Sequence, residues 1–137
     1  MNALVKTEPG RAKLALKNVP EPHPEVGHVV IEVSACGICG TDIHHYDDEF
    51  PSKPPVVLGH ELAGRVVELG SGVTNPKEGD RVTINPTGGK LCGRCRYCEM
   101  GHPFLCMDRG SHGSVLDGGF AKYCCARKEV VFKLPDN

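Results

Sequence analysis

Half of the eight cysteines of this chain lie in one short stretch, residues 91–106, which reads LCGRCRYCEMGHPFLC. Tetrahedral zinc takes four thiolates at about 2.3 Å; close spacing lets one loop supply three of them, and a longer interval lets the chain turn back with the fourth. Gly93 and Gly101 supply backbone freedom for such turns. The stretch therefore predicts a closed, structural zinc site. Its four cysteines are separated by two, two and seven residues: Cys92, Cys95, Cys98 and Cys106.

Other uses of four clustered cysteines fit the stretch less well. Iron–sulfur ligation is one alternative, but these intervals match neither of the ferredoxin patterns. Four buried thiols without a metal are another, and packing alone gives no reason to gather them within fifteen residues. Because four thiolates fill every coordination position of zinc, we expect the site to stabilise the fold rather than to act on a substrate.

The composition of the chain argues against several classes of protein. The 137 residues fit one domain, and 16 lysines and arginines nearly balance 17 aspartates and glutamates. A net charge of −1 gives no long-range attraction to nucleic acid or to an anionic membrane. No apolar run approaches the roughly 20 residues that span a bilayer, and the N-terminus lacks the apolar centre of a signal peptide. We therefore expect a cytoplasmic protein with no nucleic-acid or membrane partner and with reduced thiols available to metal.

Short runs rich in β-branched residues alternate with turn signals along most of the chain. This pattern is typical of a β-barrel or a β-sandwich. One stretch, residues 39–49, reads as a short helix, and Thr41 and Asp42 suit its N-terminal end. The expected strands span residues 28–35, 62–70, 80–84, 120–126 and 129–134.

Upstream of the four-cysteine loop, residues 35–46 (ACGICGTDIHHY) and 58–64 (LGHELAG) hold further potential metal ligands. A catalytic zinc takes three protein ligands and keeps a fourth position for water or substrate, so donors from separate segments suit it. The ion would then act as a Lewis acid on a bound oxygen. The candidate residues are Cys39, Asp42, His44, His60 and Glu61.

Each of these candidates also has a simpler explanation. The CGIC run could be a redox pair of Cys36 and Cys39. The two histidines at positions 44 and 45 could only cap or solvate the helix. His60 and Glu61 could be a surface polar pair that follows a turn. Residue types alone leave these alternatives open.

Several motifs, taken in order, closely resemble the N-terminal catalytic domain of the zinc-dependent medium-chain alcohol dehydrogenase superfamily. The resemblance covers roughly residues 3 to 137 and is nearest to the threonine, sorbitol and butanediol dehydrogenase branch. It implies a mainly-β, GroES-like fold: a partly open β-barrel with short helices and a zinc-binding loop. The motifs are CGICGTDIHHY, VLGHELAGRVVELGSGV, GDRV, the four-cysteine stretch, GGFAKY and LPDN.

The resemblance also implies ligands for two zinc ions. Cys39 and His60 would bind the catalytic zinc, and Glu61 would lie beside it as a direct or transient ligand. Asp42 would orient the ligand histidine. The structural zinc would be held by Cys92, Cys95, Cys98 and Cys106.

The implied activity is hydride transfer between a secondary alcohol or polyol and NAD or NADP. Thr41 would accept the proton of the substrate hydroxyl, and His44 would pass it towards solvent. The nicotinamide supplies the redox chemistry, while the protein positions and polarises the substrate. Which alcohol and which of the two nicotinamide cofactors are used is left open.

Residues 1–137 are expected to form one GroES-like catalytic domain. The superfamily's Rossmann cofactor domain is marked by a Gly-x-Gly-x-x-Gly run, which is not found here. We expect that domain, the remaining catalytic zinc ligand and a C-terminal segment to lie beyond residue 137. The chain is thus expected to be a fragment, inactive by itself and weak in catalytic zinc, of an enzyme that is a homo-oligomer at full length.

A zinc-stapled GroES-like binding or assembly module without redox activity is the alternative function. Such a module has no need of Cys39, His60 and Glu61 around one open metal position. The upstream donor set therefore distinguishes the two hypotheses.

Overall fold

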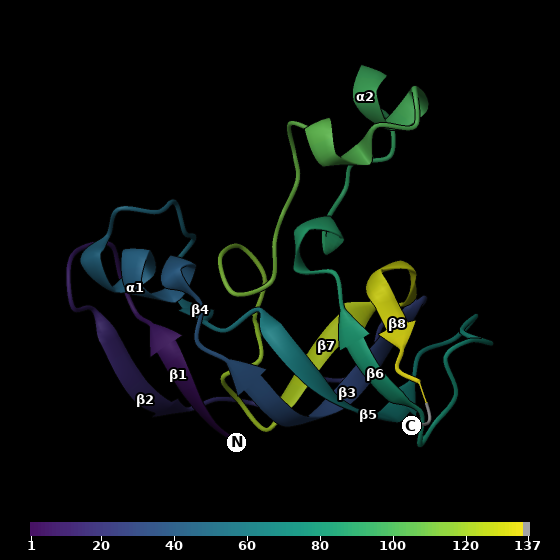
Figure 1. The fold of residues 1–137 in the computed structure, drawn as a ribbon, viewed down its shortest axis with the longest axis horizontal. Helices are drawn as coiled ribbons and strands as arrows, with labels where there is room; N and C mark the ends of the chain where they lie inside the picture. Colours follow the sequence, from purple (N-terminus) through teal and green to yellow (C-terminus); the bar gives the residue numbers. More distant parts are fainter. Residues whose placement is uncertain (136–137) are drawn as a thin grey trace.

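Two antiparallel sheets make up most of the structure (Figure 1). The computed structural model describes residues 1–135. One sheet has three strands in the order β2-β1-β4, and the other has five in the order β7-β3-β5-β6-β8. The strands are β1 (Asn2–Lys6), β2 (Leu14–Asn18), β3 (His28–Gly37), β4 (Val56–Val57), β5 (Glu61–Leu69), β6 (Arg81–Ile84), β7 (Tyr123–Arg127) and β8 (Val131–Lys133).

The helices are few and short. Helix α1 (Gly40–Asp47) lies beside the three-stranded sheet, whereas α2 (Arg96–Glu99) lies in a lobe that stands away from both sheets (Figure 1). Within residues 1–135, no helix is long and apolar enough to cross a bilayer. The 3-10 helices are η1 (Pro86–Gly88), η2 (Pro103–Leu105) and η3 (Lys128–Val130).

The larger core lies on the five-stranded sheet. Ile31 of β3 and Val82 of β6 have no exposed surface, and burial of such a side chain contributes about 1.5–3 kcal/mol. A smaller cluster of Ala3, Val5 and Val57 packs on the three-stranded sheet. The members of the larger cluster are Val29, Ile31, Leu62, Val66, Val82, Ile84, Cys124, Ala126 and Val130.

The two sheets do not close into one continuous barrel, and few backbone contacts join them. Ala3 and Ala121 form an isolated bridge, and the Leu4 N–H donates to the Phe120 carbonyl at 2.9 Å. The mainly-β, partly open architecture predicted from the sequence is therefore confirmed.

The five predicted strands correspond to β3, β5, β6, β7 and β8, and the predicted helix corresponds to α1. The sequence did not predict β1, β2, β4 or the helices of the lobe. Residues 129 and 130, predicted as strand, belong to η3.

Candidate metal centres

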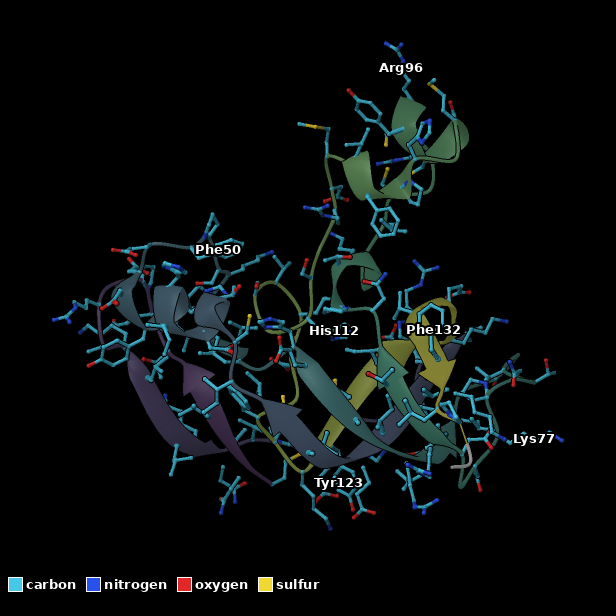
Figure 2. The ribbon with its side chains drawn as sticks, in the orientation of Figure 1. Phe50, Lys77, Arg96, His112, Tyr123 and Phe132 are labelled. Atoms are coloured by element: carbon cyan, nitrogen blue, oxygen red, sulfur yellow. The ribbon has the colours of Figure 1, made fainter. Side chains whose placement is uncertain are left out.

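The sulfur atoms of the four-cysteine loop converge in the lobe that carries α2 and η2 (Figure 2). The Sγ atoms of Cys95 and Cys98 lie 3.6 Å apart, those of Cys92 and Cys106 lie 3.6 Å apart, and those of Cys92 and Cys98 lie 4.0 Å apart. Zinc–sulfur bonds of about 2.3 Å at tetrahedral angles would place the sulfurs about 3.8 Å apart. The four donors therefore already have the spacing that one zinc ion requires.

Backbone turns give the loop this shape. Cys95 is the N-cap of α2, and Cys106 follows η2 as its C-cap. Gly93 has φ 70° and Gly101 has φ 78°, a left-handed conformation that glycine adopts without strain. The Cys92 N–H points at the Cys106 Sγ atom, 3.5 Å away. These turns bring one sulfur from each of four positions to the same centre.

The loop also stabilises the thiolate form of two of its cysteines. Hydrogen bonding from the Cys98 backbone lowers the pKa of the Cys95 thiol to about 6, and the Cys92 backbone lowers the pKa of Cys106. Desolvation raises the pKa of the Cys98 thiol to about 12. Because zinc binds thiolates, a cation would draw all four sulfurs into the charged form that two of them already favour.

The pairing of β3 with β5 creates the second donor set. Gly37, at the end of β3, lies opposite Glu61, at the start of β5. Cys39 comes two residues after Gly37 and His60 one residue before Glu61, so the two side chains meet at this edge. A Cys39 sulfur, a His60 ring nitrogen and a Glu61 carboxylate oxygen all lie within 4.8 Å of one another. The structure thus brings together the three residues predicted to ligate a catalytic metal.

Asp42 places a buried carboxylate behind these donors. Its side chain is 6% exposed, and its Oδ2 atom accepts the Cys39 N–H at 2.9 Å. Its Oδ1 atom has no hydrogen-bond partner and lies 3.8 Å from Nδ1 of His60. Leaving a buried acceptor without a hydrogen bond costs about 1–3 kcal/mol. The free Oδ1 atom is nevertheless well placed to orient the His60 imidazole when the other ring nitrogen binds a cation.

The types of donor also match zinc. One thiolate, one imidazole and one carboxylate are all donors that zinc accepts. The residues present therefore fit a zinc ion.

Glu61 is the exposed member of the donor set. Its carboxylate lies over Gly37, where an added Cβ atom would come 2.6 Å from Oε2. Gly37 therefore admits the Glu61 side chain to the site. Gly37 was not among the predicted site residues, although a glycine inside a strand is a known signal of close approach.

Thr41 and His44 lie on the helix that follows Cys39. The Thr41 hydroxyl oxygen is 3.7 Å from the Cys39 sulfur. The His44 side chain is 57% exposed, and its Nδ1 atom lies 2.9 Å from Oε2 of Glu49. Thr41 thus lies at the donor set and His44 at the solvent side of α1. Glu49 was not predicted as the partner of His44.

The cysteines outside the two donor sets behave as apolar residues. Burial raises the pKa of Cys36 to about 11, that of Cys124 to about 12 and that of Cys125 to about 11. Redox cysteines react as thiolates, so a protonated Cys36 disfavours the redox-pair interpretation of the CGIC run.

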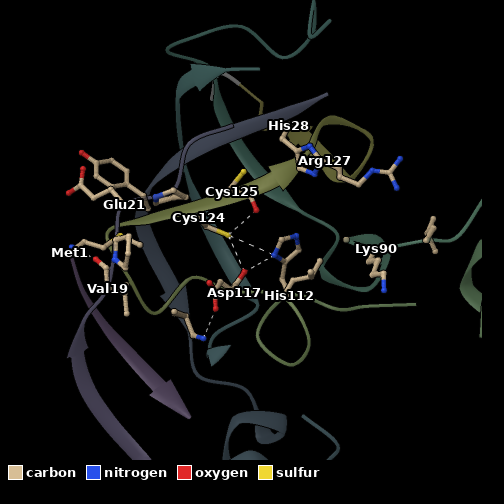
Figure 3. Close-up of a pocket in the computed structure, with 18 residues that line it drawn as sticks. Met1, Val19, Glu21, His28, Lys90, His112, Asp117, Cys124, Cys125 and Arg127 are labelled. Atoms are coloured by element: carbon tan, nitrogen blue, oxygen red, sulfur yellow. Dashed lines mark hydrogen bonds between the residues drawn. The ribbon is translucent and has the colours of Figure 1, made fainter. Parts of the chain in front are cut away.

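A cavity of about 730 Å³ lies between the start of the chain and β7 (Figure 3). His112, Asp117 and Cys124 line it, and no predicted metal ligand does. The His112 Nδ1–H donates to the Asp117 carbonyl at 2.8 Å, whereas its Nε2 atom is buried without a hydrogen-bond partner. The cavity therefore does not share a lining residue with either candidate metal centre.

Comparison with known proteins gives consistent matches. Residues 25–136 match the family described as the alcohol dehydrogenase GroES-like domain. The sorbitol dehydrogenase of Halalkalibacterium halodurans is 47% identical over 135 residues, which are 98% of this chain and 39% of that protein. The chain therefore spans about two fifths of that relative's length.

Solved structures agree with this match. A zinc-binding dehydrogenase from Sinorhizobium meliloti 1021 bound to NADP is 41% identical, with a TM-score of 0.90 over 98% of this chain and 38% of that one. A cobalt- and zinc-bound thermostable alcohol dehydrogenase from Pyrobaculum aerophilum is 31% identical, with a TM-score of 0.85 over 100% of this chain and 42% of that one. Both structures thus share the fold of the part of the chain that the structure describes.

Proposed function

The chain belongs to the alcohol dehydrogenase GroES-like domain family, and from this premise we propose that it is the catalytic domain of a zinc-dependent oxidoreductase. The proposed reaction transfers a hydride between a secondary alcohol or polyol and NAD or NADP. The observation that carries the proposal is the presence of two different donor sets: a closed one with four sulfurs, and a mixed one of Cys39, His60 and Glu61. Only the mixed set leaves a coordination position for a reactant.

We propose separate tasks for the residues of the mixed set. Cys39, His60 and Glu61 would hold zinc, which supplies Lewis-acid chemistry to a bound oxygen. Asp42, whose Oδ1 atom faces His60, would fix the orientation of the imidazole. Cys92, Cys95, Cys98 and Cys106 would hold the second zinc as a structural ion.

The proposed path of the proton follows helix α1. The Thr41 hydroxyl, beside the Cys39 sulfur, would accept the proton of the substrate hydroxyl. His44 would carry the proton to solvent, because its ring is exposed and ends in a contact with Glu49. A proton released beside the Cys39 sulfur would thus have acceptors on α1 that lead towards solvent.

The nicotinamide cofactor would be held by another part of a longer protein. The greater length of the relatives supports this, since residues 1–137 correspond to about two fifths of the sorbitol dehydrogenase. We also propose a reducing compartment such as the cytoplasm, because all eight cysteines are free thiols and the five proposed as zinc ligands must be reduced to bind metal. Self-association at full length, implied by the resemblance, stays a prediction.

A zinc-stapled binding module is the alternative function. The four-cysteine lobe by itself would support it equally well. The mixed donor set does not, because a recognition module gains nothing from a partly exposed thiol–imidazole–carboxylate cluster backed by a buried Asp42. The alternative therefore explains fewer of the observations.

The test uses the full-length protein that contains this chain. Reduction of NAD and of NADP would be followed with a panel of secondary alcohols and polyols, in the parent and in Cys39→Ser. We expect Cys39→Ser to abolish activity, because it removes the thiolate donor. Cys125→Ser, at a half-buried cysteine outside both donor sets, is the matched control and is expected to keep activity. An unaltered rate in Cys39→Ser would contradict the proposal.

A further inference from the structure

Helix α1 begins directly after Cys39 of the mixed donor set, yet it has almost no apolar packing. Only Asp42 and His45 are buried among its residues. Ile43 is 54% exposed and Tyr46 is 40% exposed. Short helices usually depend on an apolar face packed against the rest of the protein. The position of α1 must therefore be set by polar contacts.

The strongest of these contacts comes from Lys6, the last residue of β1. Its side chain is fully buried, and it is the only lysine or arginine in the buried class within residues 1–135. Removing an ammonium group from water costs several kcal/mol unless its hydrogens are all engaged. A buried lysine at this point thus requires a specific set of partners.

Lys6 has three partners, one for each ammonium hydrogen. Its Nζ atom donates to the carbonyl of His45 at 2.6 Å and to that of Gly10 at 3.3 Å. It also forms an ion pair with Oδ1 of Asp48 at 2.7 Å. The ammonium is therefore held from three directions.

Two of these partners belong to the C-terminal end of α1. His45 lies in its last turn, and Asp48 is its C-cap, in a left-handed conformation with φ 63°. The last carbonyls of a helix lack the usual partner four residues on, and the helix dipole makes this end negative. The His45 carbonyl accepts one long backbone bond here, from the Asp48 N–H at 3.4 Å. A buried cation satisfies both conditions, so Lys6 fixes the end of α1 against β1.

The other end of the same helix bears the reactive groups. Cys39 is its N-cap, and Thr41 and Asp42 lie in its first turn. Eight helical residues span only about 12 Å, so a shift or rotation at Asp48 is transmitted to Cys39 with little loss. Lys6 and Cys39 are thus linked by one short, stiff element.

We propose that Lys6 is a positioning residue for the mixed donor set: by fixing the C-terminal end of α1, it sets where Cys39, Thr41 and Asp42 stand relative to His60. This role rests on the proposed function, since it presumes that the mixed set binds metal. Lys6 does not touch the metal donors, so it acts through the helix. Its loss is expected to weaken the mixed set and to leave the four-cysteine lobe unaffected.

Cobalt titration of the 137-residue chain tests the proposal. Co²⁺ bound by four thiolates and Co²⁺ bound by one thiolate have different charge-transfer spectra, so the two sites are read separately. In Lys6→Met, we expect cobalt affinity of the mixed set to fall about tenfold or more, as for other residues that orient ligands, with the four-thiolate spectrum unchanged. Lys13→Met is the matched control, because Lys13 is exposed and pairs only with Glu8; it is expected to change neither site.

A second measurement separates failure of this role from failure of the proposed function. Amide exchange on the metal-free chain is expected to be faster in α1 of Lys6→Met and unchanged in β3 and β5. If the parent chain binds a single cobalt, as the ligand expected beyond residue 137 would explain, exchange in α1 alone decides the role of Lys6. The absence of a second cobalt from the full-length protein as well would contradict the proposed function. Two results would overturn the positioning role of Lys6. One is amide exchange in α1 that is equally fast in Lys6→Met and in the parent. The other is a Lys6→Met variant that melts at a lower temperature but binds cobalt at the mixed set as tightly as the parent.

Asp48→Ala is a second variant, with which the proposal can still be tested if Lys6→Met does not fold. It removes the ion pair but leaves the two carbonyl acceptors of Lys6, so we expect the same change in the cobalt spectrum at smaller amplitude. Unchanged affinity in Asp48→Ala, together with an unfolded Lys6→Met, would show that Lys6 is needed only for folding and would overturn the proposal.

Discussion

Oδ1 of Asp42 lies 3.8 Å from Nδ1 of His60 and has no hydrogen-bond partner within residues 1–135. This separation is too long for a hydrogen bond. The other oxygen of the same carboxylate accepts the N–H of Cys39 and so closes the first turn of α1. Asp42 therefore connects the helix that carries one metal donor to the histidine that supplies another.

Asp42→Asn tests that connection. An asparagine can still accept the Cys39 N–H through its amide oxygen, so the helix cap is kept. The negative charge facing His60 is lost, and we expect metal affinity of the mixed set to fall about 10–100-fold. The measurement is cobalt titration of the 137-residue chain. Asp47→Asn, on the same helix but paired with the exposed Arg11, is the control and is expected to leave the affinity unchanged.

The four-cysteine lobe is predicted to unfold independently when its metal is removed. Apart from Cys106, the lobe has almost no buried side chains, and Phe104, Leu105 and Met107 are all more than half exposed. At its base, Lys90 and Gly110 exchange two backbone hydrogen bonds of 2.9 and 3.0 Å. A strong chelator should therefore abolish amide protection in residues 91–109 while β3 and β5 stay protected. Loss of protection in both regions together would contradict a purely local role of this metal.

The four-cysteine site could be predicted from sequence because its ligands are neighbours in the chain. Spacing alone limits where Cys92, Cys95 and Cys98 can point. The mixed set could not be derived in this way, because Cys39 and His60 meet only through the register of β3 and β5. Residue types left that pairing open, and the family resemblance supplied it.

The unpredicted elements also have physical explanations. Strands β1 and β2 flank a Pro-Gly turn at residues 9–10, a signal that was present but not used. Strand β4 has two residues, too few to show any alternation. The burial of Lys6 could not be predicted, because it depends on the carbonyl of His45, 39 residues away in the sequence.

Stability of the 137-residue chain is predicted to fall as the pH is lowered from about 6.5. Burial lowers the pKa of His112 below its usual 6.5, so the folded chain keeps this imidazole neutral while the unfolded chain takes up a proton. The unfolded state therefore binds more protons, and its free energy falls relative to the folded state as the pH falls below 6.5. His45, whose pKa burial also lowers, acts in the same direction.

His112→Asn isolates this contribution. The asparagine amide can replace the Nδ1–H that donates to the Asp117 carbonyl, but it does not titrate. We expect urea unfolding between pH 6.5 and 5 to show a shallower loss of stability than in the parent. His23→Asn, at a histidine whose side chain is 86% exposed, should keep the parent's slope. Identical slopes in His112→Asn and the parent would rule out His112 as the source.

Gly64→Ala is predicted to destabilise the larger sheet. Gly64 lies on β5 opposite Val33, next to an irregularity in the β3–β5 register. A Cβ atom there would collide with the backbone carbonyl of Glu32, which cannot move without disturbing the ladder. Such overpacking typically costs about 1–3 kcal/mol of unfolding free energy, which urea unfolding would detect as a lower midpoint. Because β5 begins at Glu61, a shift of this strand should also weaken metal binding at the mixed set.

Gly40→Ala is the matched control for this prediction. Gly40 opens α1, and an added Cβ atom would meet nothing within 4 Å. Alanine is the better helix former, so we expect a gain of about 0.4–1 kcal/mol rather than a loss. If Gly64→Ala and Gly40→Ala changed stability by the same amount, the close approach of β5 to β3 would not be what requires glycine at position 64. A loss of stability in Gly64→Ala with a gain in Gly40→Ala would instead show that the pairing of β3 with β5, which brings Glu61 to Gly37, requires a residue without a side chain at position 64.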